Sequence, residues 1–179
     1  RSNSARQVGE PDTDQQFVIV HDTLSAEDPG STYPSAPLKL TPWEGTTAIE
    51  LLPGGEVRVE TRAGDWWGAG LEVDADVGEN LSRFKNGHMH FEIRGSSDVN
   101  FSFGFQTGSF LRGDQVNNFA SFGPGTDNLV GEEWRTVTLP IPELDGGTDL
   151  SDVTNVVAFL SRAKAPDRTL YLRNIYFTQ

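Results

Sequence analysis

Two neighbouring segments of the chain alternate apolar and polar side chains with a period of two. In HMHFEIRG, residues 88–95, one side holds Met89, Phe91 and Ile93, and in VNFSFGFQ, residues 99–106, one side holds three phenylalanines. Successive side chains of a β-strand point to opposite faces, so each segment predicts a strand with one buried and one polar face. Because consecutive strands are often neighbours, we expect these two to share a sheet and to form a continuous polar surface.

The same rhythm runs through most of the chain. Further strand-like segments are TAIELLP, EVRVETR, DWWGAGLEV, NNFASFG, EWRTVTLPI, VVAFLSR and LYLRNIYFT. The 19 glycines and 10 prolines favour short strands and turns over long helices. One short helical piece is expected in PELDGGTDLSDV. About ten strands of this kind predict an all-β fold, a two-sheet β-sandwich of the jelly-roll type.

The length of 179 residues fits one domain. Residues 1–16 carry few apolar side chains and are expected to be a linker or disordered tail, and residues 17–179 the β-sandwich domain. FVIVHD, residues 17–22, predicts the first strand, and the Pro-rich segment 23–42 predicts a long loop. The chain opens on Arg1 without a signal peptide, which suggests a mature fragment or a domain of something larger.

Charge and composition exclude several functions. The net charge is −12 and the 14 basic residues are scattered, so nucleic acid is not an expected partner. The chain has no cysteine, which excludes thiol chemistry and cysteine metal sites. No apolar run reaches the roughly 18 residues of a membrane span, so we expect no membrane partner.

Adjacent tryptophans stand at Trp66 and Trp67, in GDWWGAGLEVDAD. Parity puts Trp66 on the polar side with Gly68 and Gly70, and Trp67 on the core side with Leu71. An exposed tryptophan offers a face on which a sugar ring can stack, and the alternative is that both rings pack in the core. Glycines beside Trp66 would leave floor space for a ring.

Carboxylates recur at every second position in Glu72, Asp74 and Asp76. In one strand they would share a face, as do the paired carboxylates of retaining glycosidases. A small polysaccharide hydrolase that uses Glu72 and Asp76 is therefore the alternative function. The other explanation is a strand end that emerges into solvent.

The polar side of the two alternating strands supplies the other candidate binding residues. His90, Glu92, Arg94 and Gln106 could make directional hydrogen bonds to sugar hydroxyls, in one groove with Trp66. A solvated polar face is the alternative.

Tryptophans outside this motif have separate predictions. Trp43 could line the same site or cover a sheet edge, and Trp134, at the start of a strand, is expected in the core.

The order of DWWGAGLEV, HMHFEIRG, VNFSFGF, EWRTVTLPIPEL, DLSDVTNVVAFLS and LYLRNIYF resembles galactose-binding-like jelly rolls found beside glycoside hydrolase and lyase domains. Carbohydrate-binding module families 11 and 30, and the C-terminal sandwich of some exo-β-glucanases, are similar. Where these families often have Asp-Asn, the chain has Arg173 and Asn174, so it departs from them at Arg173. The resemblance implies a non-catalytic glycan-binding module, often with a structural calcium.

We therefore expect a module that recognises a neutral or weakly charged polysaccharide, a β-glucan or an algal glycan, and targets an attached carbohydrate-active enzyme to it. An adhesion domain is a third hypothesis. We expect a monomer that is secreted or on a bacterial cell surface. No cofactor is required; a structural calcium is compatible, with Asp22 and the acids that follow it as candidate ligands. His88 and His90 are spaced for a metal but lack a third ligand.

Overall fold

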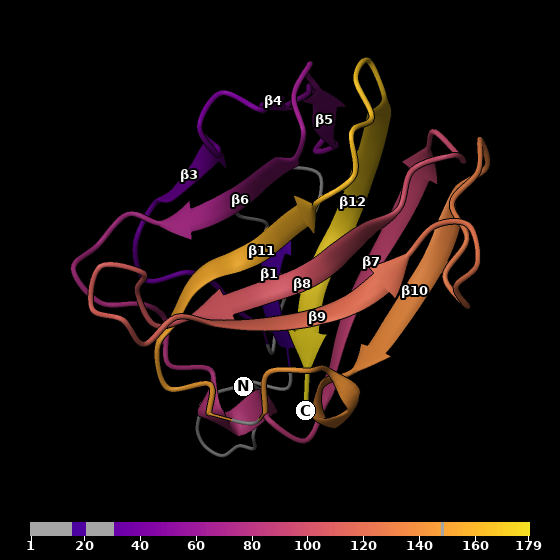
Figure 1. Ribbon diagram of the computed structural model, residues 1–179. Helices are drawn as coiled ribbons and strands as arrows, with labels where there is room; N and C mark the ends of the chain where they lie inside the picture. Colours follow the sequence, from indigo (N-terminus) through magenta and orange to yellow (C-terminus); the bar gives the residue numbers. More distant parts are fainter. Residues whose placement is uncertain (1–15, 21–30, 148) are drawn as a thin grey trace.

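The computed structural model describes residues 16–20, 31–147 and 149–179, which form two layers of β-strands (Figure 1). The strands are β1 (Gln16–Val20), β2 (Ser31–Thr32), β3 (Leu38–Pro42), β4 (Thr47–Leu51), β5 (Val57–Thr61), β6 (Trp67–Val73), β7 (His88–Gly95), β8 (Phe101–Thr107), β9 (Val116–Phe122), β10 (Arg135–Pro140), β11 (Val153–Ser161) and β12 (Thr169–Thr178). Two short 3₁₀ helices, η1 (Ser82–Phe84) and η2 (Ile141–Glu143), join them. No helix in this part of the chain is long and apolar enough to span a membrane.

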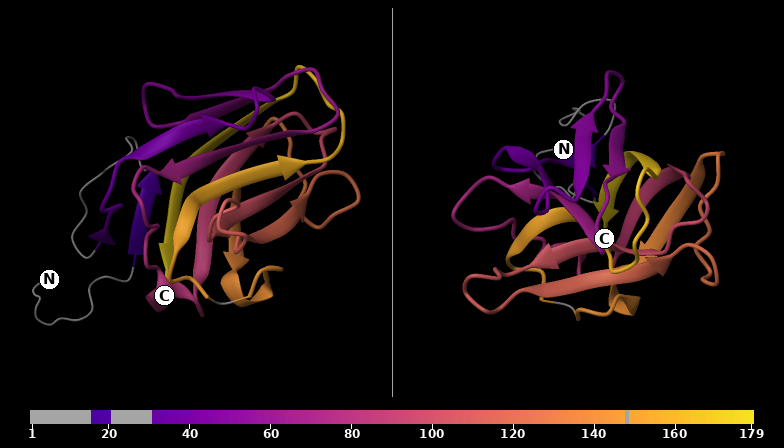
Figure 2. Two further views of the ribbon diagram at one scale, coloured as in Figure 1. Left: turned by 60° about the vertical axis from the view of Figure 1, so that its left-hand side comes forward. Right: turned by 45° about the horizontal axis from the view of Figure 1, so that its top comes forward.

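The strands divide between a seven-stranded and a five-stranded sheet. The larger has the order β10-β7-β12-β1-β2, with β5 also pairing with β12 and β4 with β5. The smaller has the order β3-β6-β11-β8-β9 and is entirely antiparallel. Figure 2 shows the two layers from two further sides. The prediction of an all-β, two-sheet sandwich is confirmed.

The core lies between the sheets and is rich in aromatic rings. Phe91 of β7 packs against Phe103 of β8 with ring centroids 4.3 Å apart, and Phe105 packs against Phe177 at 5.4 Å. All four rings are fully buried. Aromatic side chains bury the most apolar area per residue, so these contacts hold the two layers together.

The expected pairing of β7 with β8 is wrong. β7 lies between β10 and β12 in the larger sheet, whereas β8 lies between β11 and β9 in the smaller one. Each strand has one apolar face, and the two strands satisfy both by facing each other across the core, as the contact between Phe91 and Phe103 shows. Their polar faces therefore point away from each other and form no continuous surface.

The Pro-rich segment is less irregular than expected. It contains the short strand β2 and the edge strand β3, which pairs with β6 from Leu38 opposite Val73 to Pro42 opposite Ala69. A proline is tolerated at a sheet edge because no neighbour needs its missing N–H. The first strand is observed at Gln16–Val20 and the helical piece as η2; residues 1–15 and 21–30 lie outside the described residues.

Candidate functional site

The outer face of the five-stranded sheet carries a row of polar side chains in register across its strands. Glu72 on β6 is opposite Asn155 on β11, Asn155 is opposite Gln106 on β8, and Gln106 is opposite Asn117 on β9. Asn155 Nδ2 donates to Gln106 Oε1 at 3.0 Å, and Gln106 Nε2 donates to Asn117 Oδ1 at 2.8 Å. At the β3 edge, the Lys39 ammonium lies 3.6 Å from Glu72 Oε1. Five strands thus contribute to one polar row.

The adjoining part of this face is almost free of side chains. Gly70 on β6 is opposite Ala158 on β11, and Ala158 is opposite Gly104 on β8. A Cβ atom at Gly70 would lie 2.5 Å from Asn155 Oδ1, so glycine makes room for this amide oxygen. Asn155 Oδ1 is itself buried and has no hydrogen-bond partner among the described residues. The Asn155 amide thus lies over Gly70 and fills the space that a side chain there would take.

Trp43 and Trp66 lie at the edge of this floor, whereas Trp67 does not. Trp43 follows β3, where its N–H donates to Gly68 O at 3.1 Å and Thr46 Oγ1 donates to its carbonyl at 2.7 Å. The Trp43 ring packs directly over Gly68, since a Cβ atom there would collide with it. Trp66 is half-buried at the edge of the floor, whereas Trp67 is buried in the core. The predicted opposite orientation of Trp66 and Trp67 is confirmed.

One cavity of about 620 Å³ lies between the two tryptophans, Trp43 and Trp66, and the polar side chains of Glu72, Gln106 and Asn155. Its volume is typical of ligand sites. Among its lining residues are Thr41, Trp43, Trp66, Glu72, Gln106, Asn155 and residues 108–112 of the β8–β9 loop. A second cavity of about 470 Å³ lies over Ser102, Ser121 and Leu160 on the same face. We call the first cavity the groove; Gly70, Gly104 and Ala158 lie beside it on the same face and do not line it.

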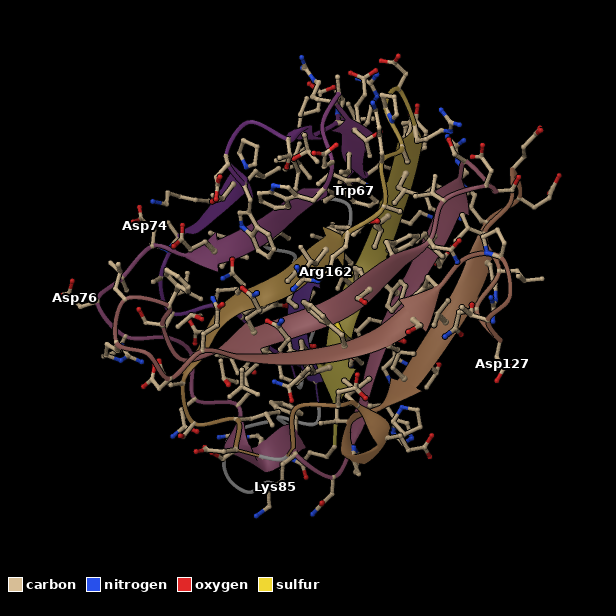
Figure 3. All side chains as sticks on the ribbon, in the orientation of Figure 1. Trp67, Asp74, Asp76, Lys85, Asp127 and Arg162 are labelled. Carbon is tan, nitrogen blue, oxygen red and sulfur yellow. The ribbon has the colours of Figure 1, made fainter. Side chains whose placement is uncertain are left out.

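The acidic trio is only partly as predicted. β6 ends at Val73, so Asp74 and Asp76 lie on the exposed loop beyond it and do not share a strand face with Glu72 (Figure 3). Glu72 Oε1 accepts a hydrogen bond from Thr41 Oγ1 at 3.3 Å. Glu72 and Asp76 both line the groove, but the strand does not place them as an adjacent pair.

The other predicted binding residues lie on the outer face of the seven-stranded sheet. His90, Glu92 and Arg94 belong to β7, so the prediction of one groove that joins them to Trp66 and Gln106 is wrong. The reason is the separation of β7 and β8 into different sheets.

Each of these three residues is engaged within its own sheet. The His90 ring stacks on Tyr176 at 4.6 Å, and its Nε2 lies 2.8 Å from the hydroxyl oxygen of Thr178. Burial, helped by the neighbouring His88, lowers the pKa of His90 below its ordinary value. A neutral ring that is stacked and hydrogen-bonded has little left to offer a ligand.

A second part of this network centres on Glu92. Asn174 Nδ2 donates to one of its oxygens at 2.7 Å and Arg173 Nε to the other at 2.9 Å. Burial raises the pKa of Glu92, but the two hydrogen bonds and the Arg173 charge outweigh burial and hold it below its ordinary value. Asn174 adopts a positive φ of 51° at a register shift in β12. Arg173, where the chain departs from Asp-Asn, thus bonds to Glu92 of β7 together with Asn174.

The aromatic members of this face pack against arginine. The Arg94 guanidinium lies 4.1 Å from the Tyr171 ring centre and 5.1 Å from that of Trp134, and Arg173 lies 4.1 Å from Trp134 on its own account. Trp134 is therefore half-buried on the surface rather than in the core as predicted. Cation–π contacts of this kind stabilise a sheet surface.

A comparison with protein families gives a match to carbohydrate binding domain 30 over residues 11–179. The chain belongs to this family. The resemblance to family 30 that the motifs predicted is confirmed, and the protein is a carbohydrate-binding module.

Solved structures show the same fold. The family 30 module of the cellulosomal cellulase Cel9D-Cel44B of Clostridium thermocellum is 20% identical, with a TM-score of 0.66, and the match covers 92% of this chain and 97% of that one. Another family 30 module is 22% identical, with a TM-score of 0.59, over 78% and 76%. A variant of the family 29 module CBM29-2 complexed with mannohexaose is 10% identical, with a TM-score of 0.57, over 91% and 90%. The search of curated proteins found no match.

Sequence reasoning missed the central residue of the groove in this module. In DLSDVTNVV, simple alternation puts Asn155 on the same side as Val153 and Val157, which are in the core. The register of β11 shifts between Asn155 and Val157, so that Asn155 pairs with Glu72 and faces outward. A bulge of this kind leaves no mark in the sequence pattern.

No calcium site can be assigned to the described residues. Among them, no group of three or more His, Asp or Glu side chains could hold a metal. Asp22 and the acids that follow it lie outside the described residues.

Proposed function

We propose that the groove binds a polysaccharide chain, with a β-glucan as the first candidate and an algal glycan as the second. The observation that carries the proposal is the combination of two tryptophans, Trp43 and Trp66, with the polar side chains of Glu72, Gln106 and Asn155 around one cavity. Sugar rings have apolar C–H faces that stack on aromatic rings and hydroxyls that need directional partners. The groove offers both within one cavity.

The binding residues in this proposal are Trp43, Trp66, Glu72, Gln106 and Asn155. The outer face of the seven-stranded sheet is left out, because its polar groups bond to each other. The family 30 relative belongs to a cellulase and the family 29 variant was complexed with a mannan oligosaccharide, which supports a neutral glycan as ligand.

The biological role that we propose is attachment. A single site of modest affinity, linked to a carbohydrate-active enzyme, raises the local concentration of that enzyme at an insoluble substrate. Because β-glucans and algal glycans lie outside bacterial cells, we propose that the protein acts at the surface of a bacterium or in its surroundings. We also propose that one copy suffices, since the groove draws all its residues from one chain.

A binding panel tests this function. Pull-down on insoluble β-glucans, agar and alginate, and titration with mannohexaose, should reveal retention on at least one of the neutral glycans. Release of reducing sugar by the pure protein should be absent. Failure to bind any glycan of the panel would refute the function, and sugar release that disappears in Glu72→Gln would instead favour the hydrolase.

The position of the site is tested with matched variants. Trp43→Ala should weaken binding about fivefold or more, as expected for the loss of one stacked ring. Arg94→Ala, on the other sheet, should leave binding unchanged. Equal losses in both variants would show that the site is not confined to the groove.

A further inference from the structure

The β8–β9 loop, residues 108–115, carries the two most exposed large apolar side chains of the described chain. Phe110 is 80% exposed and Leu111 is 94% exposed. Water contact with apolar area of this size costs free energy that a surface of polar residues would avoid. Two such side chains next to each other indicate that a ligand covers them.

The exposure is a property of a well-formed loop. Asp114 Oδ1 accepts from Ser109 N–H at 2.7 Å, and Asp114 N–H donates back to Ser109 O at 3.2 Å. Gly113 N–H donates to Phe110 O at 3.1 Å, and Leu111 N–H donates to Ser109 Oγ at 3.2 Å. These hydrogen bonds fix the backbone of the loop in a conformation that leaves the side chains of Phe110 and Leu111 exposed.

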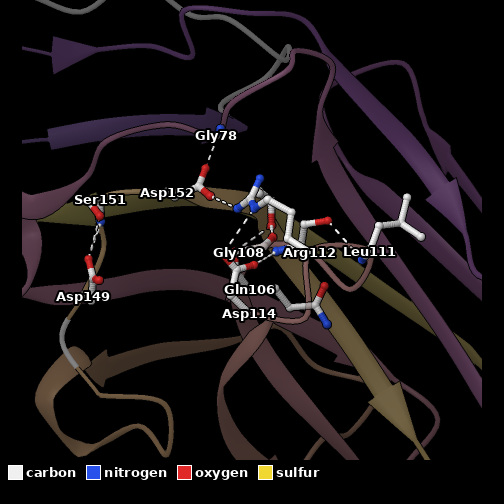
Figure 4. A network of polar contacts seen from close by, with 11 residues as sticks. Gly78, Gln106, Gly108, Leu111, Arg112, Asp114, Asp149, Ser151 and Asp152 are labelled. Atoms are coloured by element: carbon white, nitrogen blue, oxygen red, sulfur yellow. Dashed lines mark hydrogen bonds and ion pairs between the residues drawn. The ribbon is translucent and has the colours of Figure 1, made fainter.

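One carboxylate joins this loop to the rest of the groove. Asp152, just before β11, accepts from Arg112 Nη2 on one oxygen at 2.5 Å and from Gly78 N–H on the other at 2.7 Å (Figure 4). Arg112 Nε also donates to Asp114 Oδ2 at 3.2 Å. Asp152 therefore ties together the β8–β9 loop and the loop that follows β6.

The location of the loop identifies what covers its tip. Phe110 and Leu111 line the same cavity as Trp43 and Trp66. In the strand order, β3 and β6 lie on one side of β11, and β8 and β9 lie on the other. A chain in the groove would therefore meet the tryptophans from one side and the loop tip from the other.

We propose that Phe110 and Leu111 form a second apolar wall of the groove, which packs on the C–H faces of the bound glycan, and that Asp152 is the residue that positions this wall through Arg112. The proposal rests on the proposed function and adds to it the side of the site that faces away from the tryptophans. The occupant is a neutral glycan, because between the two apolar sides the cavity presents the amides of Gln106 and Asn155 beside the carboxylates of Glu72 and Asp76, which disfavour an anionic chain.

The contact is tested with soluble β-glucan as the probe, by isothermal titration. Phe110→Ala should weaken binding about fivefold, and Leu111→Ala somewhat less, by the loss of apolar contact. Both side chains are exposed in the free protein, so the melting temperature should stay unchanged. Leu129→Ala is the matched control, because Leu129 is 58% exposed and does not line the groove.

Two results separate this proposal from the proposed function. If the wild type binds and Trp43→Ala weakens binding but Phe110→Ala does not, the groove stands and the second wall is refuted. If the wild type binds no glycan of the panel, the proposed function fails and the wall fails with it.

The positioning role is tested with a double-mutant cycle. Asp152→Asn removes the charge that holds Arg112 but keeps an oxygen for Gly78 N–H, and it should weaken binding about two- to fivefold, the range of an exposed ion pair. In a background that carries both Phe110→Ala and Leu111→Ala the same change should have no further effect, because both contacts that it positions are gone. Equal losses in both backgrounds, or no loss in either, would refute the positioning role.

Discussion

The two outer faces of the sandwich are built from the same kind of alternating strand and yet differ in what they leave open. On the seven-stranded sheet, Glu92 is bonded to Arg173 and Asn174, and His90 is stacked on Tyr176. On the five-stranded sheet, Asn155 Oδ1 is buried without a partner among the described residues. Polarity alone therefore does not mark a binding face.

The difference comes from side-chain size in the rows between the polar groups. The larger sheet places arginine and aromatic rings beside its carboxylate and histidine, so each polar group finds a partner within the sheet. The smaller sheet places Gly70, Gly104 and Ala158 there, and within its polar row Asn155 Oδ1 has no hydrogen-bond partner among the described residues. The two faces thus differ in side-chain size beside their polar groups, and this difference underlies the proposal that the five-stranded sheet carries the site.

The largest expected effect concerns the core that both faces share. Trp67→Ala should lower the free energy of unfolding by roughly 3–5 kcal/mol, because it removes a buried ring and leaves a cavity. Thermal denaturation measures the loss. A melting temperature that is unchanged would mean that Trp67 does not lie in the core, and the assignment of inner and outer faces would be inverted.

A side chain in place of Gly70 should weaken glycan binding at the outer face of the five-stranded sheet. A Cβ atom in Gly70→Ala would push the Asn155 amide aside, and we expect β-glucan affinity to fall about tenfold, because Asn155 is a proposed binding residue of the groove and one hydrogen bond is worth roughly that much. Gly131→Ala is the control, because a Cβ atom at Gly131 meets nothing within 4 Å. Unchanged affinity in Gly70→Ala would show that the glycan does not reach the floor.

On the outer face of the seven-stranded sheet, a substitution should lower stability rather than glycan affinity. Glu92→Ala leaves Arg173 and Asn174 without their acceptor and should lower the free energy of unfolding by about 1 kcal/mol. Glycan affinity, measured in parallel, should not change. A loss of affinity with intact stability would move the binding site to this face.

The smallest expected effect is a dependence of stability on pH. The pKa of His90 is lowered from an ordinary value of 6.5, so the unfolded chain takes up the proton more readily than the folded one. Stability should therefore fall as the pH drops below about 6.5 and towards the lower folded pKa. His90→Gln should flatten this part of the curve of melting temperature against pH; an unaltered curve would show that His90 carries none of it.

The strands and the fold class could be predicted because alternation is a local property. HMHFEIRG became β7 with the same bounds, and Trp66 and Trp67 took the sides that parity gives them. The partners of each strand could not be predicted, because two apolar faces are buried equally well side by side or across a core. The phenylalanines of β7 and β8 chose the second arrangement.

The candidate site was predictable in part for the same reason. Trp43, Trp66, Glu72 and Gln106 lie around one cavity, as expected from parity and motif. Asn155 was hidden by a bulge, and Phe110 by its place in a turn, where no periodic pattern exists. Non-local pairing and irregular backbone therefore limit what the sequence alone can give.

The central claim is that the outer face of the five-stranded sheet binds glycan and the outer face of the seven-stranded sheet does not, and the half-buried Trp66 and Trp134 test it from the two faces. We would measure β-glucan affinity and melting temperature for Trp66→Ala and Trp134→Ala. The first should lose affinity about fivefold or more with a nearly unchanged melting temperature, since one stacked ring is lost. The second should lose stability, because Arg94 and Arg173 lose their aromatic partner, and should keep its affinity. Loss of affinity in Trp134→Ala with full affinity in Trp66→Ala would contradict the account.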